Sequence, residues 1–331
     1  MSAAPGALPP VVILSRNEVV AMMTPADYLD SVETGFRALH DGQAKVPPPW
    51  RIEGDGGGFH GKGASLRLDR LYVALKLNGN FPGNPVGHGL PSIQGALLLC
   101  DGGTGSPLAI MDSIEITLRR TAAATALAAR YLARPDSATL LVCGCGDQAR
   151  AQIDALRSVL PIRRVLAFDR DSSRAEQLAL EQPGVEAVAD LRKAALEADI
   201  IVTATPATEP YLGADMVRPG SFVAAVGADA PHKSEIQPNL MASALVVVDS
   251  REQCAVMGDL HHAIEAGAMG ADDVHAELAD LVARSRPGRT DDRQITLFDS
   301  TGTAVQDVAS AIRIYERALA AGAGLQLRLG E

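Results

Sequence analysis

The chain has 331 residues, of which 47% are hydrophobic, 21% charged and 4% aromatic, and its formal net charge is −10. This length allows two domains that each bury their own core. The acidic balance and the scarcity of aromatic residues argue against a surface for nucleic acid or anionic lipid, so we expect a small-molecule partner, no nucleic acid and no membrane.

The beginning of the chain and its cysteines indicate a cellular compartment. Residues 1–14 contain no basic segment and no long apolar stretch, which predicts no export signal and a cytoplasmic protein. The four cysteines lack the clustered partners of a zinc site, so we expect no metal. Cys143 and Cys145 could form a redox pair, but their place between a strand and a glycine turn favours simple packing.

The first part of the chain predicts an α+β domain. A helix is expected over residues 25–42. Apolar strand candidates follow at 71–79, 95–102 and 107–112, and the glycine turn before the last of them predicts antiparallel pairing. Between helix and strands, the glycine-rich segment from Gly54 to Gly63 is interpreted either as a substrate lid or as a disordered surface loop.

The second part alternates short apolar runs with helical segments. Runs without polar alternation are typical of parallel strands buried on both faces. They lie at residues 139–143, 164–168, 199–205, 221–227, 244–249 and 295–299. This rhythm predicts the α/β class, with a Rossmann-type doubly wound parallel sheet.

Two helices set the expected domain boundaries. The Ala-rich segment 116–133 joins the two parts, and a C-terminal helix over 303–322 returns to close the first domain. We therefore predict one domain of residues 1–118 with 305–331, and a Rossmann domain of residues 119–304.

The clearest chemical motif follows the first strand of the Rossmann region. Gly144, Gly146 and Ala149 fit G-x-G-x-x-A, in which the glycines allow a tight turn and close approach of a pyrophosphate. Asp147 and Gln148 begin the next helix, whose free N–H groups can bind phosphate.

Asp169 strengthens the nucleotide interpretation. It ends the next strand, 169 − 144 = 25 residues after the first glycine, where a carboxylate can bind the ribose hydroxyls. The acid favours NAD, although Arg170 and the serines after it leave NADP possible. The alternative is a plain glycine turn with Asp169 as a helix cap.

Several motifs in order give the chain a family resemblance. They are residues 76–85, 89–95, 106–136, 143–149, 225–236 and 298–307. Together they resemble the ornithine cyclodeaminase and μ-crystallin family. The resemblance implies a substrate-binding and dimerisation role for the first domain, a homodimer, and NAD on the second.

The resemblance also implies roles for individual residues. Lys76 is expected to be catalytic and to bind substrate, with Arg51 and Arg120 holding the substrate carboxylate. Arg119 is the rival of Arg120, because consecutive helix residues point about 100° apart. Asp229, beyond a strand's carboxyl end, is expected to act as general acid and base.

Further residues are assigned more simply. The resemblance places Ser92, Thr121, Thr205 and Ser300 with the loop residues at the cofactor. His232 and Lys233 are expected to be structural or exposed to solvent, and His261 and His262 to be solvated helix residues.

The family activity implied is hydride transfer at the Cα–N bond of a small amino acid or imino acid, as in an alanine dehydrogenase or imine reductase. Ornithine cyclodeamination with catalytic NAD and a non-catalytic μ-crystallin-like binding protein are the alternatives. Residues 58–68 lack the glutamate that ornithine-specific members carry; Lys62 lies there instead, and only Glu53, Asp55 or Asp69 could substitute. This favours a dehydrogenase or reductase.

Overall fold

The structure is a computed structural model that describes residues 9–329. Its contacts divide the chain into two compact units, Met1–Arg120 with Thr303–Glu331 and Thr121–Gly302. The boundaries expected from the sequence differ from these by two residues at each junction. Residues 1–8, on which the expectation of no export signal partly rests, lie outside the described residues.

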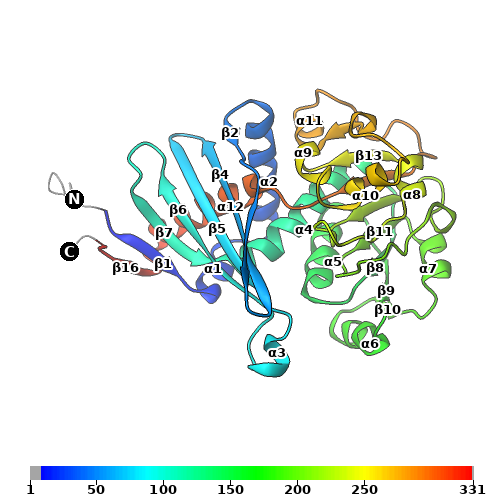
Figure 1. Ribbon diagram of the computed structural model, residues 1–331, viewed down its shortest axis with the longest axis horizontal. Coiled ribbons are helices and arrows are strands. Elements are labelled where there is room, and N and C mark those ends of the chain that lie inside the picture. The colour runs from blue at the N-terminus through cyan, green and yellow to red at the C-terminus, as the bar shows by residue number, and fades with distance from the viewer. Residues whose placement is uncertain (1–8, 330–331) are drawn as a thin grey trace. The chain divides into compact units, whose positions relative to one another are not determined.

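The first unit contains a mixed eight-stranded sheet (Figure 1). Its strands are β1 (Val11–Leu14), β2 (Ala44–Lys45), β3 (Trp50–Gly54), β4 (Gly57–Arg67), β5 (Leu71–Asn80), β6 (Ile93–Asp101), β7 (Pro107–Asp112) and β16 (Leu325–Leu327). The order is β16-β1-β7-β6-β5-β4-β2, with β3 also paired to β4. All neighbours are antiparallel except β1 and β7, so the antiparallel expectation is confirmed for the strands predicted.

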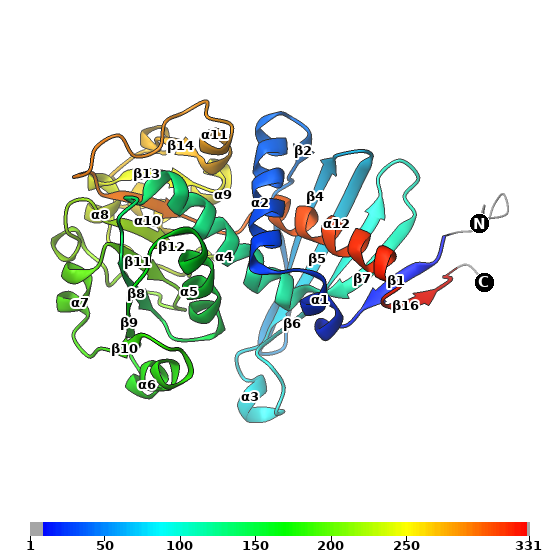
Figure 2. The same cartoon turned by 180° about the vertical axis from the view of Figure 1, so that it is seen from behind.

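Helices cover one face of this sheet. They are α1 (Arg16–Met22), α2 (Pro25–His40) and α12 (Ala304–Ala321); the short α3 (Asn84–Gly87) lies in the connection between β5 and β6, and α4 (Ser113–Leu132) begins in this unit. Figure 2 shows α2 and α12 lying against the strands. A side chain at Gly35 would meet the Val305 carbonyl oxygen at 3.0 Å, which explains the glycine where α2 crosses α12.

The glycine-rich segment from Gly54 to Gly63 is an ordered hairpin and not a disordered loop. It forms the turn of the β3–β4 hairpin and the N-terminal part of β4, with Gly54 paired to Gly57. Asp55 and Gly56 form the tip, and Gly56 has φ +78°, which glycine adopts without a steric penalty. Glycine recurs along β4 because neighbours lie where side chains would be: a Cβ at Gly61 would be 2.0 Å from the Trp50 ring.

The second unit is built on an eight-stranded parallel sheet. Its strands are β8 (Thr139–Cys143), β9 (Arg164–Phe168), β10 (Val185–Ala187), β11 (Ile200–Thr203), β12 (Phe222–Ala225), β13 (Leu245–Val248), β14 (Ala276–Glu277) and β15 (Thr296–Asp299). The order β10-β9-β8-β11-β12-β15-β13-β14 reverses at β8 and confirms the doubly wound fold. The sequence missed β10 and β14, which are too short to show an apolar run.

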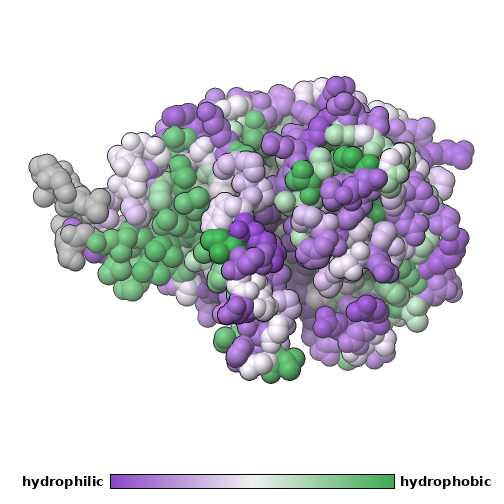
Figure 3. Space-filling view, viewed as in Figure 1, coloured by the Kyte–Doolittle hydropathy of each residue, from purple (hydrophilic) through white to green (hydrophobic). Residues whose placement is uncertain are grey.

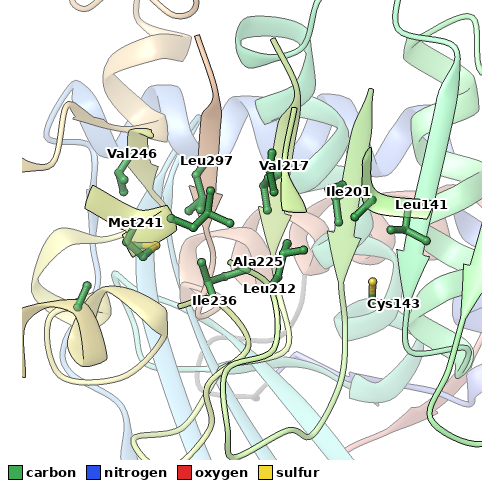
Figure 4. Close-up of a cluster of buried hydrophobic side chains, with 14 of the residues drawn as sticks. Leu141, Cys143, Ile201, Leu212, Val217, Ala225, Ile236, Met241, Val246 and Leu297 are labelled. Carbon is green, nitrogen blue, oxygen red and sulfur yellow. The ribbon is translucent and has the colours of Figure 1, made fainter. Parts of the chain in front are cut away.

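Helices and buried aliphatic side chains complete the second unit. The helices are α5 (Asp147–Val159), α6 (Ser172–Glu181), α7 (Leu191–Glu197), α8 (Pro238–Ser243), α9 (Arg251–Cys254), α10 (Asp259–Glu265) and α11 (Leu278–Val282). Figure 4 shows Leu141, Ile201 and Leu297 from three strands in one core cluster. Among residues 9–329, no helix has the length and apolar character needed to cross a bilayer.

Candidate active site and nucleotide-binding loop

The glycine loop lies where the strand order of the second sheet reverses. Gly144 follows β8 with φ +91°, and a Cβ there would lie 2.6 Å from the Ala204 carbonyl oxygen at the end of β11. A Cβ at Gly146 would meet nothing within 4 Å, so that glycine leaves open space in front of the helix. Gly146 is the N-cap of α5, and Ala149 is buried against the strands.

The first residues of α5 offer donors beside this open space. Asp147 is exposed, whereas Gln148 is partly buried and its amide nitrogen has no partner in the described structure. A buried donor without a partner can bind a ligand oxygen. The space at Gly146, the helix N-terminus and this amide together fit the pyrophosphate of a dinucleotide.

Asp169 lies against the same loop. Its Oδ2 accepts a hydrogen bond from the Cys145 backbone N–H at 2.8 Å, and its Oδ1 accepts from the Asp171 N–H at 3.0 Å. Arg170 beside it is exposed. The carboxylate is therefore held at the strand end where a ribose is bound in dinucleotide folds.

Cys143 and Cys145 are both buried and free in this region. Burial raises the pKa of Cys145 to about 12 and that of Cys143 well above its ordinary value. Thiols of this kind are poor nucleophiles, which supports the packing interpretation.

Glu235 joins the loops that follow β11 and β12. Its buried carboxylate accepts from the Thr205 N–H at 2.7 Å, from the Thr205 hydroxyl at 2.6 Å and from the Gly227 N–H at 2.8 Å. The Thr203 and Tyr211 hydroxyls donate to it as well. Thr205, expected at the cofactor, is thus fixed by a residue that the sequence did not single out.

Asp229 lies in the loop after β12, on the edge of the sheet that carries the glycine loop. Its side chain is 56% exposed and forms an ion pair with Lys233, Nζ to Oδ1 2.6 Å. Lys233, expected to be structural or exposed to solvent, is largely covered and fixes this carboxylate. The arrangement leaves Asp229 accessible to a small molecule.

The remaining residues expected at the cofactor occupy varied positions. Ser300 is buried, and its hydroxyl donates to Asp249 at 3.0 Å. Thr121 is partly buried on α4, and Ser92 lies before β6, where its carbonyl oxygen accepts from the Phe81 N–H at 2.7 Å. None of these three positions assigns a cofactor role by itself.

In the first unit, Lys76 is the centre of a buried charged cluster. Alternation along β5 points Lys76 toward α12 while Leu75 and Leu77 face the other side. Its Nζ lies 2.9 and 2.8 Å from the two Asp307 carboxylate oxygens and donates to the Thr117 hydroxyl at 3.1 Å. Only 5% of the Lys76 side chain is exposed.

Arg120 shares the same acid. Its Nε donates to Asp307 Oδ1 at 3.1 Å, and its Nη1 donates to the Gln306 side-chain oxygen at 2.9 Å. Arg119, the rival residue, is instead 30% exposed and pairs with Glu115 one helical turn earlier. The structure therefore brings Arg120, and not Arg119, together with Lys76.

The cluster shifts the ionisation of its members. Burial lowers the pKa of Lys76 to about 7; the Asp307 charge opposes this shift, and the positive charges of Arg120 and Lys62 add to it. Burial alone would raise the pKa of Asp307, but Lys76 and Arg120 outweigh it and hold that pKa below its ordinary value. Lys76 can therefore exchange a proton near neutral pH.

Sheet register places further cations on the face of Lys76. Lys62 on β4 pairs directly with Lys76 on β5, and Arg51 on β3 pairs with His60, two residues from Lys62 on β4. Arg51 donates to Glu53 at 2.7 Å and contacts His60 at 3.1 Å. Three cations from neighbouring strands therefore share one side of the sheet.

Sequence reasoning missed Asp307, Gln306, Thr117 and Glu235. Asp307 had one available signal, since it is a lone acid in the apolar first turns of a long C-terminal helix. The other three are polar residues whose partners lie far away in the sequence, so only the fold reveals them.

Comparisons with known proteins identify a matching family and similar structures. The model of the ornithine cyclodeaminase/mu-crystallin family matches residues 11–322. The alanine dehydrogenase of Archaeoglobus fulgidus is 37% identical over 318 residues, covering 96% of this chain and 98% of its own.

Two solved structures have the same fold over nearly the whole chain. One, an archaeal alanine dehydrogenase dimer with bound NAD, has a TM-score of 0.91 and 36% identity, covering 97% of this chain and 99% of its own. The other is Thermococcus litoralis Δ1-pyrroline-2-carboxylate reductase in complex with NADH and L-proline. Its TM-score is 0.91 at 34% identity, over 96% of this chain and all of the other.

Proposed function

Because the chain belongs to the ornithine cyclodeaminase/mu-crystallin family, we propose that it is an NAD-dependent oxidoreductase acting on the Cα–N bond of a small amino acid or imino acid. The observation that carries this proposal is the buried cluster of Lys76, Arg120 and Asp307. A buried lysine is suited to donate a hydrogen bond to the reacting group of the substrate, and a fixed guanidinium is suited to bind a carboxylate.

Different residues bind the substrate and the cofactor. Arg51 and Arg120 bind the substrate α-carboxylate. Protonated Lys76 donates a hydrogen bond to the substrate. The glycine loop, Gln148 and Asp169 hold NAD, and the acid disfavours the 2′-phosphate of NADP.

When bound, the nicotinamide cofactor would supply or accept the hydride at the carbon of the C=N bond, depending on the direction. In reduction, the iminium carbon gains the hydride and the nitrogen becomes a neutral amine. Asp229 then supplies the proton that gives the ammonium and regains one from solvent, to which it is open.

The charge of the substrate face supports reduction over ornithine cyclodeamination. Lys62 pairs with Lys76 on the sheet face where a distal ammonium would need an acid. Repulsion between two cations in a poorly solvated site is unfavourable. A substrate without a distal ammonium fits better.

The deciding experiment follows NADH oxidation with pyruvate, glyoxylate, oxaloacetate and cyclic imines in the presence of ammonium. Net oxidation is expected, and Asp229→Asn should reduce it by about 10²–10⁴-fold. Asp272→Asn, a change at another exposed acid of the same unit, is the matched control and should retain activity. Proline and ammonia from L-ornithine without net NADH change would instead identify a cyclodeaminase, and NADH binding without turnover would identify a binding protein.

A pair of glycine variants tests the nucleotide site. Gly146→Ala adds a Cβ to open space, so we expect ordinary folding but weak NADH binding, because the pyrophosphate needs that space. Gly144→Ala forces a Cβ against the Ala204 carbonyl at positive φ, so it should lower the melting temperature as well. Unchanged NADH affinity in Gly146→Ala would place the nucleotide elsewhere.

We also infer a homodimer, formed through the strand face of the first unit, and a cytoplasmic location. Trp50, Ile52, Phe59, Leu75 and Leu77 share the face opposite α2 and α12 and are 37–55% exposed. Figure 3 shows hydrophobic side chains gathered over this side of the unit. Light scattering should give twice the chain mass, and Leu75→Glu should weaken the association; a wild-type monomer would contradict the inference.

A further inference from the structure

Three possible metal ligands meet on helix α10, apart from both sites described above. His261, His262 and Glu265 each offer one ligand atom, and these atoms all lie within 4.8 Å of one another. The Nε2 of His261 is 3.5 Å from one Glu265 oxygen, and the Nδ1 of His262 is 3.7 Å from the other. Helical spacing of three and four residues places all three on one face.

The outer nitrogens of both rings contact backbone carbonyls. His261 Nδ1 lies 3.3 Å from the Ala255 oxygen, and His262 Nε2 lies 2.9 Å from the Lys233 oxygen. Because a carbonyl only accepts hydrogen bonds, these nitrogens carry the protons. In neutral rings, the nitrogens that face Glu265 therefore hold lone pairs.

Two imidazole lone pairs and a carboxylate thus converge with no hydrogen between them when the rings are neutral. A proton on one ring or a bound cation completes this arrangement. It also reproduces the pattern of metal-bound histidines, whose other ring N–H donates to a carbonyl or carboxylate that fixes the tautomer. The two rings are mostly covered, 22% and 24% exposed, which differs from the solvated residues expected from the sequence.

The geometry matches a small tetrahedral ion. Zinc lies about 2.1 Å from nitrogen and oxygen ligands, so neighbouring ligands of a tetrahedron are about 3.4 Å apart. The His261 and His262 nitrogens lie 3.5 and 3.7 Å from different Glu265 oxygens, and one ligand atom from each of the three residues lies within 4.8 Å of the other two, so small side-chain shifts would bring them to this edge. Calcium and magnesium prefer oxygen ligands alone, so two nitrogens select a transition metal.

We propose that His261, His262 and Glu265 form a binding site for one divalent transition-metal ion, with Zn²⁺ the best match. This proposal departs from the expectation, drawn from the cysteines, that the chain binds no metal. Three protein ligands leave one position of the tetrahedron for water.

The surroundings hold this helix in place and connect it to the Asp229 loop. Asp259, at the start of α10, accepts from the backbone N–H groups of Glu235 and Ile236 at 2.7 and 2.9 Å. The carbonyl that fixes His262 belongs to Lys233, whose side chain pairs with Asp229. A bound ion would therefore brace the loop that carries Asp229.

The test uses full-length, untagged protein freed of metal with a chelator and titrated with Zn²⁺ by calorimetry and with Co²⁺ by visible absorption. We expect one ion per chain with nitrogen and oxygen ligands, and a melting temperature raised by roughly 5–10 °C at a hundredfold excess over Kd. His261→Ala and His262→Ala should weaken binding by at least ~10–100-fold.

Two further variants keep the result interpretable. Glu265→Gln removes the third ligand at a side chain that is 62% exposed, so folding should be unaffected while affinity falls. His275→Ala removes a partly buried histidine whose ring contacts the Pro287 carbonyl, away from helix α10, and the variant should bind metal like the wild type. Absence of one-to-one binding, binding that survives all three ligand changes, or a thiolate-to-Co²⁺ charge-transfer band would overturn the proposal.

Discussion

Both units bury carboxylates, but they neutralise them in opposite ways. Asp307 in the first unit faces two cations, and its pKa lies below the ordinary value. Glu235 in the second unit is held by hydroxyl and backbone N–H donors, and burial raises its pKa. The first arrangement holds a mobile proton on Lys76, whereas the second fixes two loops. A buried acid therefore takes its role from the charge of its partners.

The largest effect should come from removing the cation of the first arrangement. Lys76→Met keeps an apolar chain of similar length on β5 but removes the proton-carrying nitrogen. Imine reduction should fall by about 10²–10⁴-fold. NADH binding, measured by fluorescence, should persist because the nucleotide residues lie in the other unit. Activity within tenfold of the wild type would show that the cluster is structural.

Removing the acid of the second arrangement should mainly affect stability. Glu235→Ala leaves the five hydrogen-bond donors around it without an acceptor in a buried place, so the free energy of unfolding should fall by about 3 kcal/mol or more. Denaturant titration measures it. Glu209→Ala, at an exposed glutamate of the same unit, should be close to neutral. A small effect at Glu235 would mean that water replaces the carboxylate.

Asp307→Asn should move the pH profile of kcat/KM. The negative charge of Asp307 raises the pKa of Lys76, which burial otherwise lowers, so removing the charge must lower that pKa further below about 7. The Lys76 inflection should therefore shift to lower pH. A wild-type inflection retained in this variant would exclude Lys76 as the titrating group. Thr117→Val, which removes an uncharged partner, is the control and should shift it less.

The smallest effect is expected at Arg119. Arg119 is 30% exposed but pairs with the largely buried Glu115, so Arg119→Ala should cost about 1–2 kcal/mol of stability and leave KM unchanged. Arg120→Ala should raise KM for the imino acid, because it removes a guanidinium that is fixed and buried. Equal effects at the two arginines would remove the distinction between them.

The two regions also differ in how far the sequence predicts them. Gly144, Gly146 and Asp169 are read from the chain because strand, glycine turn and helix are local features. The cluster in the first unit joins Lys76 to Asp307 across 231 positions, and nothing local links them. Family resemblance predicts Lys76 and Arg120 as site residues, whereas nothing in the sequence analysis singled out Asp307. The sequence did not predict the hairpin at Gly54–Gly63. Its glycines are required by close neighbours such as Trp50, and only the pairing of strands reveals these neighbours.

The carboxylate of Glu235 has a consequence for redesign of this enzyme. It accepts hydrogen bonds from Thr203 at the end of β11, from Thr205 just after that strand, and from Gly227 after β12. Grafting either loop alone from a relative would therefore leave the acceptor with a mismatched set of donors. Residues 203–236 should be exchanged as a single cassette, and chimaeras that cut between these loops are expected to express poorly even when each loop is native to the family.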